Sequence, residues 1–290
     1  MPELLHPRAQ ARRRPAAAGG QRLVLSSGVH RWAGFSRSRP AVVKPVPIAG
    51  LLVTATDTGV GKTVVAGAIA QWLSRQGRRV AVSKPLASGC VHRREGLVSE
   101  DAEFLAHCAD ARHPLDLICP VRFAEPLAPA VASERAGEPV DWESVQRSLS
   151  LMCRGSDVIV VEGVGGVLVP LDTRHTMADL AGWLGLPAVV VARPGLGTIN
   201  HTLLTLEALR SRGVKVAGVV INRYPPDKAS VAEETNPRVI EKWGKTTVLA
   251  IVPDEPISLV HGIPAIPRGI QAAIAAVDWL RLAESGGCRP

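Results

Sequence analysis

The fold of this chain is decided by the stretch Leu51-Leu-Val-Thr-Ala-Thr-Asp-Thr-Gly-Val-Gly-Lys-Thr63. Its pattern indicates a short apolar strand, a glycine-containing turn and a helix that begins at Lys62 and Thr63. The N–H groups of such a turn and the N-terminus of the helix both favour a bound anion. In loops of this kind the lysine contacts the outer phosphates and the hydroxyl binds Mg²⁺. We therefore predict a nucleoside triphosphate site at Thr58, Gly59, Val60, Gly61, Lys62 and Thr63.

The match to the standard phosphate-binding loop, or P-loop, is incomplete. The standard pattern has a glycine five residues before the second glycine, where Thr56 stands here. An ordinary strand–turn–helix unit would explain the glycines. It would not explain a lysine and a threonine at the start of the helix, and we therefore favour a P-loop.

The charge of the chain is concentrated at its N-terminus. The 290 residues are 46% hydrophobic, which allows one large α/β domain or two small ones. The net charge is +8, but residues 1–50 contain nine Lys/Arg and a single acidic residue, Glu3. The remaining residues contain 25 basic and 25 acidic side chains. A neutral body argues against nucleic acid as a partner.

Residues 1–48 are basic, poor in acidic residues and rich in Arg, Ala and Ser, with prolines such as Pro15 and Pro40. These are features of an organelle transit peptide, although a disordered tail or an upstream extension has the same composition. We expect residues 1–48 to be a disordered extension and residues 49–290 to be the folded P-loop domain. The expected location is the cytoplasm, or an organelle if the extension is a transit peptide.

The cysteines and histidines are scattered. Cys90, Cys108, Cys119, Cys153 and Cys288 form no CxxC pair, so reduced thiols are expected. The histidines show no zinc-binding spacing, and no GxSxG hydrolase motif occurs. Without an apolar run of 18 residues, we expect no transmembrane helix and no membrane partner.

Apolar strands and amphipathic helices alternate along the chain. Near-continuous Val/Ile runs predict strands buried on both faces, and the alternation predicts right-handed crossovers in a parallel sheet. We therefore expect a single P-loop NTPase-like α/β domain with a mainly parallel central sheet flanked by helices. Beyond the first strand, strands are predicted at 80–82, 157–161, 187–192, 215–222 and 248–251, helices at 64–75, 101–108, 142–153, 177–184, 200–212 and 269–282, and mainly loop at 109–141.

Polar residues follow several of these strands. Because ligands of such sheets bind at the carboxyl ends of the strands, these residues should converge on one edge. They are Lys84 and Ser88, Glu162, Arg193 and Asn222.

Two of these residues have a specific chemistry. Lys84 precedes Pro85, and a residue before proline is kept in an extended conformation. Its ammonium group suits binding of a phosphoryl or carboxylate oxygen. Glu162 after Asp157-Val-Ile-Val-Val161 is similar to a Walker B carboxylate that binds Mg²⁺. Asp101 is a possible third oxygen ligand, or only part of a helix N-cap region.

Seven features together carry a family resemblance: Thr54-Ala-Thr-Asp-Thr-Gly-Val-Gly-Lys-Thr63, Lys84-Pro-Leu-Ala-Ser-Gly89, Asp101, Phe123-Ala-Glu-Pro126, Glu162-Gly-Val-Gly-Gly166, Gly197-Thr-Ile-Asn-His201 and Asn222. In order and approximate spacing, over about residues 50–255, they resemble the dethiobiotin synthetases. The resemblance implies an ATP-dependent ligase that forms dethiobiotin from 7,8-diaminopelargonate, CO₂ and ATP through a phosphorylated carbamate.

The resemblance also implies roles for individual residues. It assigns catalytic roles to Lys84, Lys62 and Thr58. Mg²⁺ would be bound by Thr63, Asp101 and Glu162, and these residues also belong to the ATP site with Asn222 and Pro253. The substrate would contact Ser88, Gly165, Gly197, Thr198 and Asn200. In the family the Gly197–Asn200 segment serves the partner subunit, which implies a homodimer.

Two positions depart from the family pattern. Ala55 stands where the family usually has the first glycine of the loop, and we expect its methyl group to crowd the turn. Some members have a tyrosine from the partner subunit at the substrate carboxylate, but Tyr224, the single tyrosine here, lies elsewhere in the sequence.

Two other classes share the P-loop. Amidoligases of cobalamin synthesis need a glutaminase domain with a nucleophilic cysteine, for which this chain is expected to be too short. ATPase switches of the ParA/MinD type have an extra lysine near the start of the loop, where Asp57 stands here. Both alternatives are therefore less favoured than the ligase.

Overall fold

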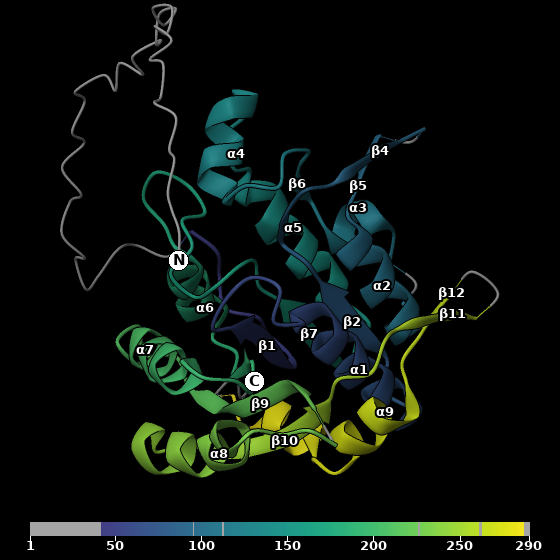
Figure 1. Cartoon of the computed structure of the whole chain (residues 1–290). Coiled ribbons are helices and arrows are strands. Elements are labelled where there is room, and N and C mark those ends of the chain that lie inside the picture. The colour runs from purple at the N-terminus through teal and green to yellow at the C-terminus, as the bar shows by residue number, and fades with distance from the viewer. Residues whose placement is uncertain (1–41, 95, 112, 226, 261–262, 287–290) are drawn as a thin grey trace, which may run out of the picture. The chain divides into compact units, whose positions relative to one another are not determined.

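The computed structural model describes residues 42–94, 96–111, 113–225, 227–260 and 263–286. These residues contain a central sheet of six parallel strands in the order β10-β9-β8-β1-β7-β2 (Figure 1). Every residue of β2, β7 and β8 is buried, as expected for strands that helices cover on both faces. The strands are β1 (Ala49–Ala55), β2 (Val80–Ser83), β7 (Val158–Glu162), β8 (Ala188–Ala192), β9 (Val216–Tyr224) and β10 (Val248–Pro253).

The direction of the chain across the sheet reverses around β1. The connection from β1 to β2 runs one way, and the connections from β7 through β8 and β9 to β10 run the other. Right-handed crossovers in opposite directions place their helices on opposite faces. Thus α1 (Lys62–Arg75) lies on one face, and α6 (Met177–Leu184), α7 (Thr198–Arg210) and α8 (Val231–Gly244) lie on the other. Ligands bind at such a reversal, where the P-loop follows β1.

The other elements flank this core. The remaining described helices are α2 (Glu100–Ala109), α3 (Leu115–Ile118), α4 (Pro129–Ala136), α5 (Trp142–Cys153), α9 (Arg268–Ala275) and α10 (Trp279–Glu284). Short strands pair outside the main sheet: β3 (Leu86–Ser88) with β6 (Val121–Phe123), β4 (Val91–Arg93) with β5 (Gly96–Val98), and β11 (Ser258–Val260) with β12 (Ile263–Ala265). Helix α1 packs between α2 and α9 and against β1 and β7, which fixes the helix that follows the P-loop.

The predicted α/β class with a central parallel sheet is confirmed, but the prediction of mainly loop at 109–141 is wrong. That segment contains α3, β6 and α4. Helix α4 starts with Pro129 and is followed by the C-cap residue Gly137, which has a φ of 68°. Proline at the start and glycine just past the end are the usual limits of a short helix.

Two further helical segments differ from the prediction. The single helix expected at 269–282 is two helices, α9 and α10, and Asp278 caps the second by accepting from Arg281 N at 3.0 Å. The sequence pattern predicts no element between Asn222 and Val248, where the structure has α8. A capping box of Ser230 and Glu233 starts this helix, and that pattern was present in the sequence.

Two side chains before the predicted domain boundary at residue 49 are buried. Val43 is 0% exposed and Val46 is 3% exposed, and Val46 N donates to Leu184 O at 3.0 Å. The segment from residue 42 therefore packs onto the body. Residues 1–41 and Cys288 lie outside the described residues, and the expectations for a disordered extension or a transit peptide remain predictions.

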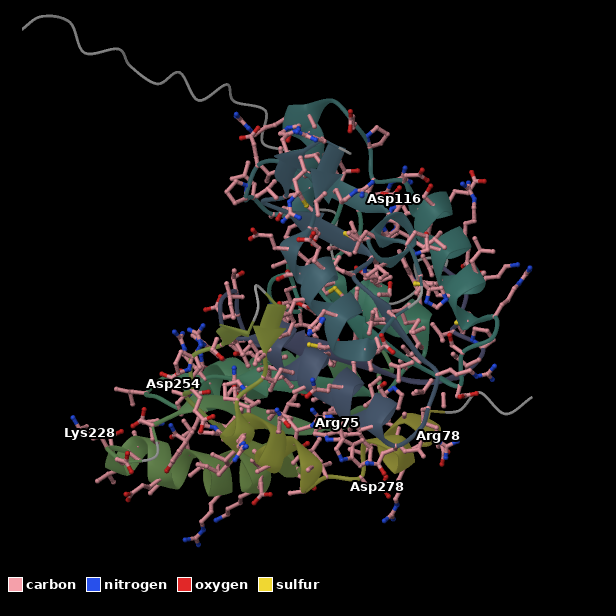
Figure 2. The ribbon with its side chains drawn as sticks, turned by 90° about the vertical axis from the view of Figure 1, so that its right-hand side faces the viewer. Arg75, Arg78, Asp116, Lys228, Asp254 and Asp278 are labelled. Atoms are coloured by element: carbon pink, nitrogen blue, oxygen red, sulfur yellow. The ribbon has the colours of Figure 1, made fainter. Side chains whose placement is uncertain are left out.

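The surface of the described part is charged. The labelled side chains of Asp116, Lys228 and Asp254 in Figure 2 are all exposed. Within the described ranges, no helix combines the length and the apolar character needed to cross a membrane.

Candidate active site

The P-loop connects the end of β1 to the first residue of α1. Gly59 and Gly61 have φ values of 75° and 92°, a region that favours glycine. A Cβ at Gly61 would also clash with the side-chain amide of Asn222. Ala55, where we expected crowding, is a regular residue of β1 paired with Val191, and its φ is not positive. Its methyl group therefore occupies an ordinary buried strand position.

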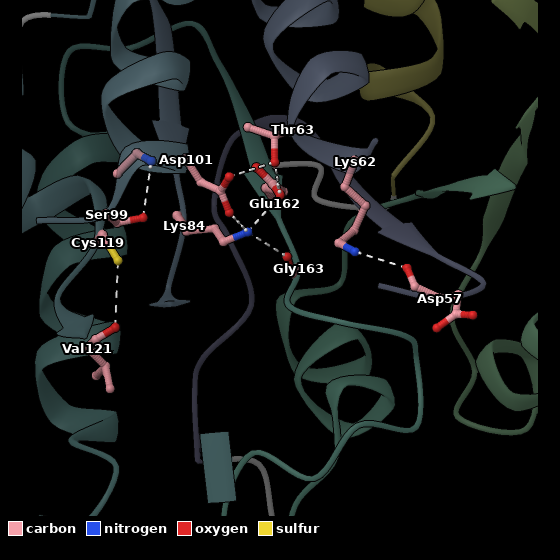
Figure 3. A network of polar contacts seen from close by, with 11 residues as sticks. Asp57, Lys62, Thr63, Lys84, Ser99, Asp101, Cys119, Val121, Glu162 and Gly163 are labelled. Atoms are coloured by element: carbon pink, nitrogen blue, oxygen red, sulfur yellow. Dashed lines mark hydrogen bonds and ion pairs between the residues drawn. The ribbon is translucent and has the colours of Figure 1, made fainter. Parts of the chain in front are cut away.

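Thr63, Asp101 and Glu162 meet beside the P-loop although they are far apart in the sequence (Figure 3). Thr63 Oγ1 lies 2.9 Å from Asp101 Oδ1 and 2.9 Å from Glu162 Oε1. Glu162 ends β7, whose pairing with β1 brings its carboxylate to the loop. Asp101 belongs to the first turn of α2, which Ser99 caps by accepting from Ala102 N at 3.3 Å.

Lys84 lies between the same two carboxylates. Its Nζ is 2.7 Å from Glu162 Oε1 and 2.8 Å from Asp101 Oδ2, and it donates to Gly163 O at 3.2 Å. Only 4% of the side chain is exposed. The extended backbone of Lys84 is held by a hydrogen bond from its N–H to Ile118 O at 2.7 Å. The structure thus brings four predicted site residues from four segments into direct contact.

The charges in this cluster depend on one another. Burial alone would lower the pKa of Lys84, but the carboxylates of Glu162 and Asp101 hold it above its ordinary value. Burial would raise the pKa of Asp101, but the Lys84 ammonium and its hydrogen bond hold it below the ordinary value. Burial raises the pKa of Glu162, which is 1% exposed. Lys84 and Asp101 therefore form an ion pair at neutral pH.

Lys62 turns back onto its own loop. Its Nζ donates to Asp57 O at 3.3 Å, and the residue is 7% exposed (Figure 3). Burial lowers the pKa of Lys62, partly offset by nearby Glu162. Thr58 is exposed, and its N–H donates to Asp57 Oδ1 at 2.7 Å. These two predicted catalytic residues therefore both hydrogen-bond to Asp57, Lys62 to its backbone carbonyl and Thr58 to its side chain.

Asn222 joins β9 to the P-loop. Its Nδ2 donates to Val60 O at 2.8 Å, and the residue is 3% exposed. Pro253 ends β10 and pairs with Tyr224, the last residue of β9, two residues after Asn222, so both residues predicted for the base site lie on neighbouring strands.

The residues predicted to bind the substrate lie in separate segments. Ser88 ends β3, which pairs with β6 and not with the main sheet. Gly165 lies in the loop after β7 with a φ of 57°. Gly197, with a φ of 90°, precedes α7, in which Thr198 is buried and Asn200 is exposed. No hydrogen bond among the described residues links these five residues to the Lys84 cluster.

One contact between the P-loop and the α7 segment was not predicted. Arg193, which follows β8, has its Nη2 3.7 Å from Asp57 Oδ2 and 3.3 Å from His201 Nδ1. The sequence placed Arg193 at a strand end but not beside Asp57. That proximity depends on β1 and β8 being neighbours in the sheet.

The chain is similar to known proteins over most of its length. Residues 49–259 match a family model described as an AAA domain. The ATP-dependent dethiobiotin synthetase BioD of Thermodesulfovibrio yellowstonii is 40% identical over 212 residues, which cover 71% of this chain and 88% of that protein. The protein of the same name from Anaeromyxobacter sp. strain K is 46% identical over 208 residues, 71% of this chain and 91% of its own length.

A solved structure supports the fold alone. The ParA family ATPase of Chlorobium tepidum TLS aligns with a TM-score of 0.50 over 83% of this chain and 99% of that chain. The two sequences are 15% identical, and at this level only the architecture is shared.

Proposed function

This chain belongs to the ATP-dependent dethiobiotin synthetase family, and on that basis we propose that it closes the ureido ring of dethiobiotin in biotin biosynthesis. The substrates are 7,8-diaminopelargonate, CO₂ and ATP. The structural observation that carries the proposal is the buried Lys84 ammonium, which contacts the same two carboxylates as Thr63 of the P-loop. A cation at this place suits an anionic substrate next to the terminal phosphate of ATP.

The reaction balances in three steps. One amine of the substrate adds to CO₂ and releases a proton to form a carbamate. A carbamate oxygen then takes the γ-phosphoryl group, and ADP leaves. The second amine attacks the carbonyl carbon of this mixed anhydride and loses a proton, the C–O bond to phosphate breaks, and the ring closes as phosphate leaves. Phosphoryl transfer of this kind needs positioning and charge neutralisation from the protein.

The P-loop and its neighbours meet these needs. The N–H groups of residues 58–63 surround the phosphates, and Lys62 exchanges its bond to Asp57 O for the γ-phosphate. Lys84, Thr58 and Ser88 hold the carbamate and the charge that develops on it.

Asn222 selects the base. Its Nδ2 is committed to Val60 O, so its side-chain oxygen is the atom that accepts from the adenine amino group. Pro253 lies next to this position at the end of the neighbouring strand.

The oxygen atoms beside the P-loop fit Mg²⁺. Glu162 Oε2 is buried and has no hydrogen-bond partner among the described residues, and hydroxyl and carboxylate oxygens are the donors that Mg²⁺ prefers. The described residues contain no group of three or more His, Cys, Asp and Glu side chains that could hold a metal. The Thr63 hydroxyl is therefore needed with Asp101 and Glu162. When bound, Mg²⁺ would neutralise phosphate charge.

We also propose a homodimer in which the first turn of α7 serves the partner's site, as the family resemblance implies. Mixing two inactive variants tests this arrangement. Lys84→Gln and Asn200→Ala subunits should restore roughly a quarter of parental activity, because half of randomly mixed dimers contain one intact site. Activity that stays at the level of the single variants would contradict a shared site.

We also place the enzyme in a reducing compartment such as the cytoplasm. The four described cysteines, Cys90, Cys108, Cys119 and Cys153, are free and buried, which supports this proposal.

The decisive experiment measures ADP formation with the substrates supplied separately. We expect ADP and dethiobiotin only when both 7,8-diaminopelargonate and bicarbonate are present. ATP hydrolysis that is indifferent to both compounds, but is stimulated by DNA or a partner protein, would overturn the ligase proposal in favour of an ATPase switch.

A further inference from the structure

Asp172, a partly buried carboxylate outside the Lys84 cluster, accepts four hydrogen bonds. Asp172 Oδ2 accepts from Trp142 Nε1 at 2.7 Å and from His175 Nδ1 at 2.8 Å. Asp172 Oδ1 accepts from the backbone N–H groups of Arg174 and His175, both at 2.7 Å. Burial would raise the pKa of Asp172, but these hydrogen bonds hold it below its usual value. The group is therefore an ionised acceptor at neutral pH.

The partner histidine is fixed by aromatic packing. The His175 ring lies edge-on to Trp183 of α6 at a centroid distance of 4.8 Å and to Trp142 of α5 at 6.0 Å. The two tryptophans contact each other at 5.5 Å. We call Asp172, His175, Trp142 and Trp183 the loop anchor, because they attach the loop of residues 163–176 to two helices.

The opposite end of this loop lies against the P-loop. Gly163 N, immediately after Glu162, donates to Val53 O of β1 at 2.9 Å. A Cβ on Gly166 would make ordinary van der Waals contacts with Thr56 O at 3.4 Å and with the Cα of Asp57 at 3.7 Å, so the backbone of this loop passes beside the residues that begin the P-loop. The loop thus runs from the cluster, along the start of the P-loop, to the anchor.

The anchor is separate from the groups that hold the nucleotide. Glu162 is positioned by the pairing of β7 with β1 and β2 and by its contact with Lys84. The loop passes Thr56 and Asp57, which precede the phosphate-binding residues 58–63 in the chain. Loosening the anchor should therefore affect the segment with Gly165 and Gly166 and leave the phosphate-binding residues in place.

We propose that Asp172 and His175 are positioning residues that hold the Gly165–Gly166 segment against the P-loop, so that the diamine side of the site is formed. The inference rests on the proposed ligase function. It assigns a part in the reaction to residues that touch neither ATP nor Mg²⁺ ligands in this arrangement. A residue that supported only the fold would change the kinetics for both substrates alike.

The test is Asp172→Asn, which keeps the shape but places an amide where the carboxylate accepts from Trp142 and His175. We expect the KM for 7,8-diaminopelargonate to rise by about tenfold or more, with the KM for ATP near the parental value, because misplacement by a distant change can cost this much. Asp141→Asn is the matched control: this exposed residue caps the same helix α5, and it accepts from Ser144 N and not from the loop. Equal changes for both substrates, or Asp172→Asn kinetics identical to those of the control, would overturn the proposal.

Hydrogen exchange provides a readout that does not depend on activity. Amides of residues 163–171 should exchange faster in Asp172→Asn than in Asp141→Asn, while those of β7 and α1 keep their protection. Unchanged exchange in the loop would refute the anchor even if the parent protein made no dethiobiotin. A parent without ligase activity but with faster loop exchange in the variant would refute the proposed function alone.

Discussion

At the level of single residues, the site contains two buried lysines in different environments. Lys84 is held by two carboxylates, whereas Lys62 contacts a backbone carbonyl at 3.3 Å. When a phosphate replaces the carbonyl oxygen of Asp57, Lys62 therefore gives up a hydrogen bond to a neutral acceptor and gains an anionic one. Lys84 remains an ammonium group, because both of its partners are anions.

Lys62→Ala should lower kcat by about 100-fold or more, since it removes a cation from the charge that develops on the γ-phosphate. The rate of dethiobiotin formation at saturating substrates measures this effect. Lys228→Ala, at an exposed surface position, is the control. A near-parental kcat for Lys62→Ala would show that the lysine does not contact the transferred group.

Gly61→Ala should weaken ATP binding more than Gly59→Ala. Both positions have positive φ, so each substitution costs about 1–2 kcal/mol of backbone strain. Only at Gly61 does the added Cβ clash with Asn222; at Gly59 nothing lies within 4 Å of it. Calorimetric titration with ATP compares the two variants. Equal losses of affinity would mean that the contact with Asn222 does not shape the loop.

At the level of elements, the register of β2 and β7 is supported where both strands begin. Arg79 N donates to Asp157 Oδ2 at 2.8 Å, Asp157 N donates to Arg79 O at 2.8 Å, and the two side chains form an exposed ion pair. Because Lys84 and Glu162 sit at the other ends of these strands, the same register sets their distance. The position of the edge strand β2 therefore sets the distance between Lys84 and Glu162 as well as completing the sheet.

Asp157→Asn should destabilise the protein in a pH-dependent way. Hydrogen bonds from the side chain and backbone of Arg79 lower the pKa of Asp157 to about 2 from an ordinary value of 3.8. Its contribution to stability is thus complete above the ordinary value and is lost as the pH falls toward the folded value.

Urea denaturation of the parent and of Asp157→Asn measures this effect. The difference between their midpoints should be constant from neutral pH to pH 5 and should shrink below pH 4. High salt should reduce it, because the pair is exposed. A difference that grows as the pH falls would contradict the lowered pKa.

At the level of the whole molecule, the folded body includes residues before the first strand. Val43 and Val46 are buried in the same core as the sheet. The N-terminal limit of the folded domain therefore lies at these buried residues, before the start of β1.

Deleting residues 1–41 should leave activity and stability unchanged, whereas deleting residues 1–47 should lower the melting temperature. The second deletion removes two buried valines, each worth about 1.5–3 kcal/mol at most. Calorimetry and the ADP assay compare both truncations with the full chain. A large loss of stability in the shorter deletion would show that the basic extension is structural.

Much of the candidate site was predictable because its signals are local. Lys62 and Thr63 follow a strand and start a helix, and Glu162 ends a run of buried valines. Helix α8 was missed although a capping box marks its start, and the helices and strand in 109–141 were missed because they are short. The contact of Arg193 with Asp57 could not be predicted, since no local pattern says that β1 and β8 are neighbours.

The sequence by itself determined the α/β class, the P-loop and the family, because these depend on hydrophobic periodicity and on motifs within short segments. Tertiary structure decided which residues meet. It placed Lys84 between Asp101 and Glu162, joined Asn222 to Val60, and tied Asp172 to Trp142. The physical reason is that strand order and register set distances between segments, and a buried charge is stable only where those distances supply its partners.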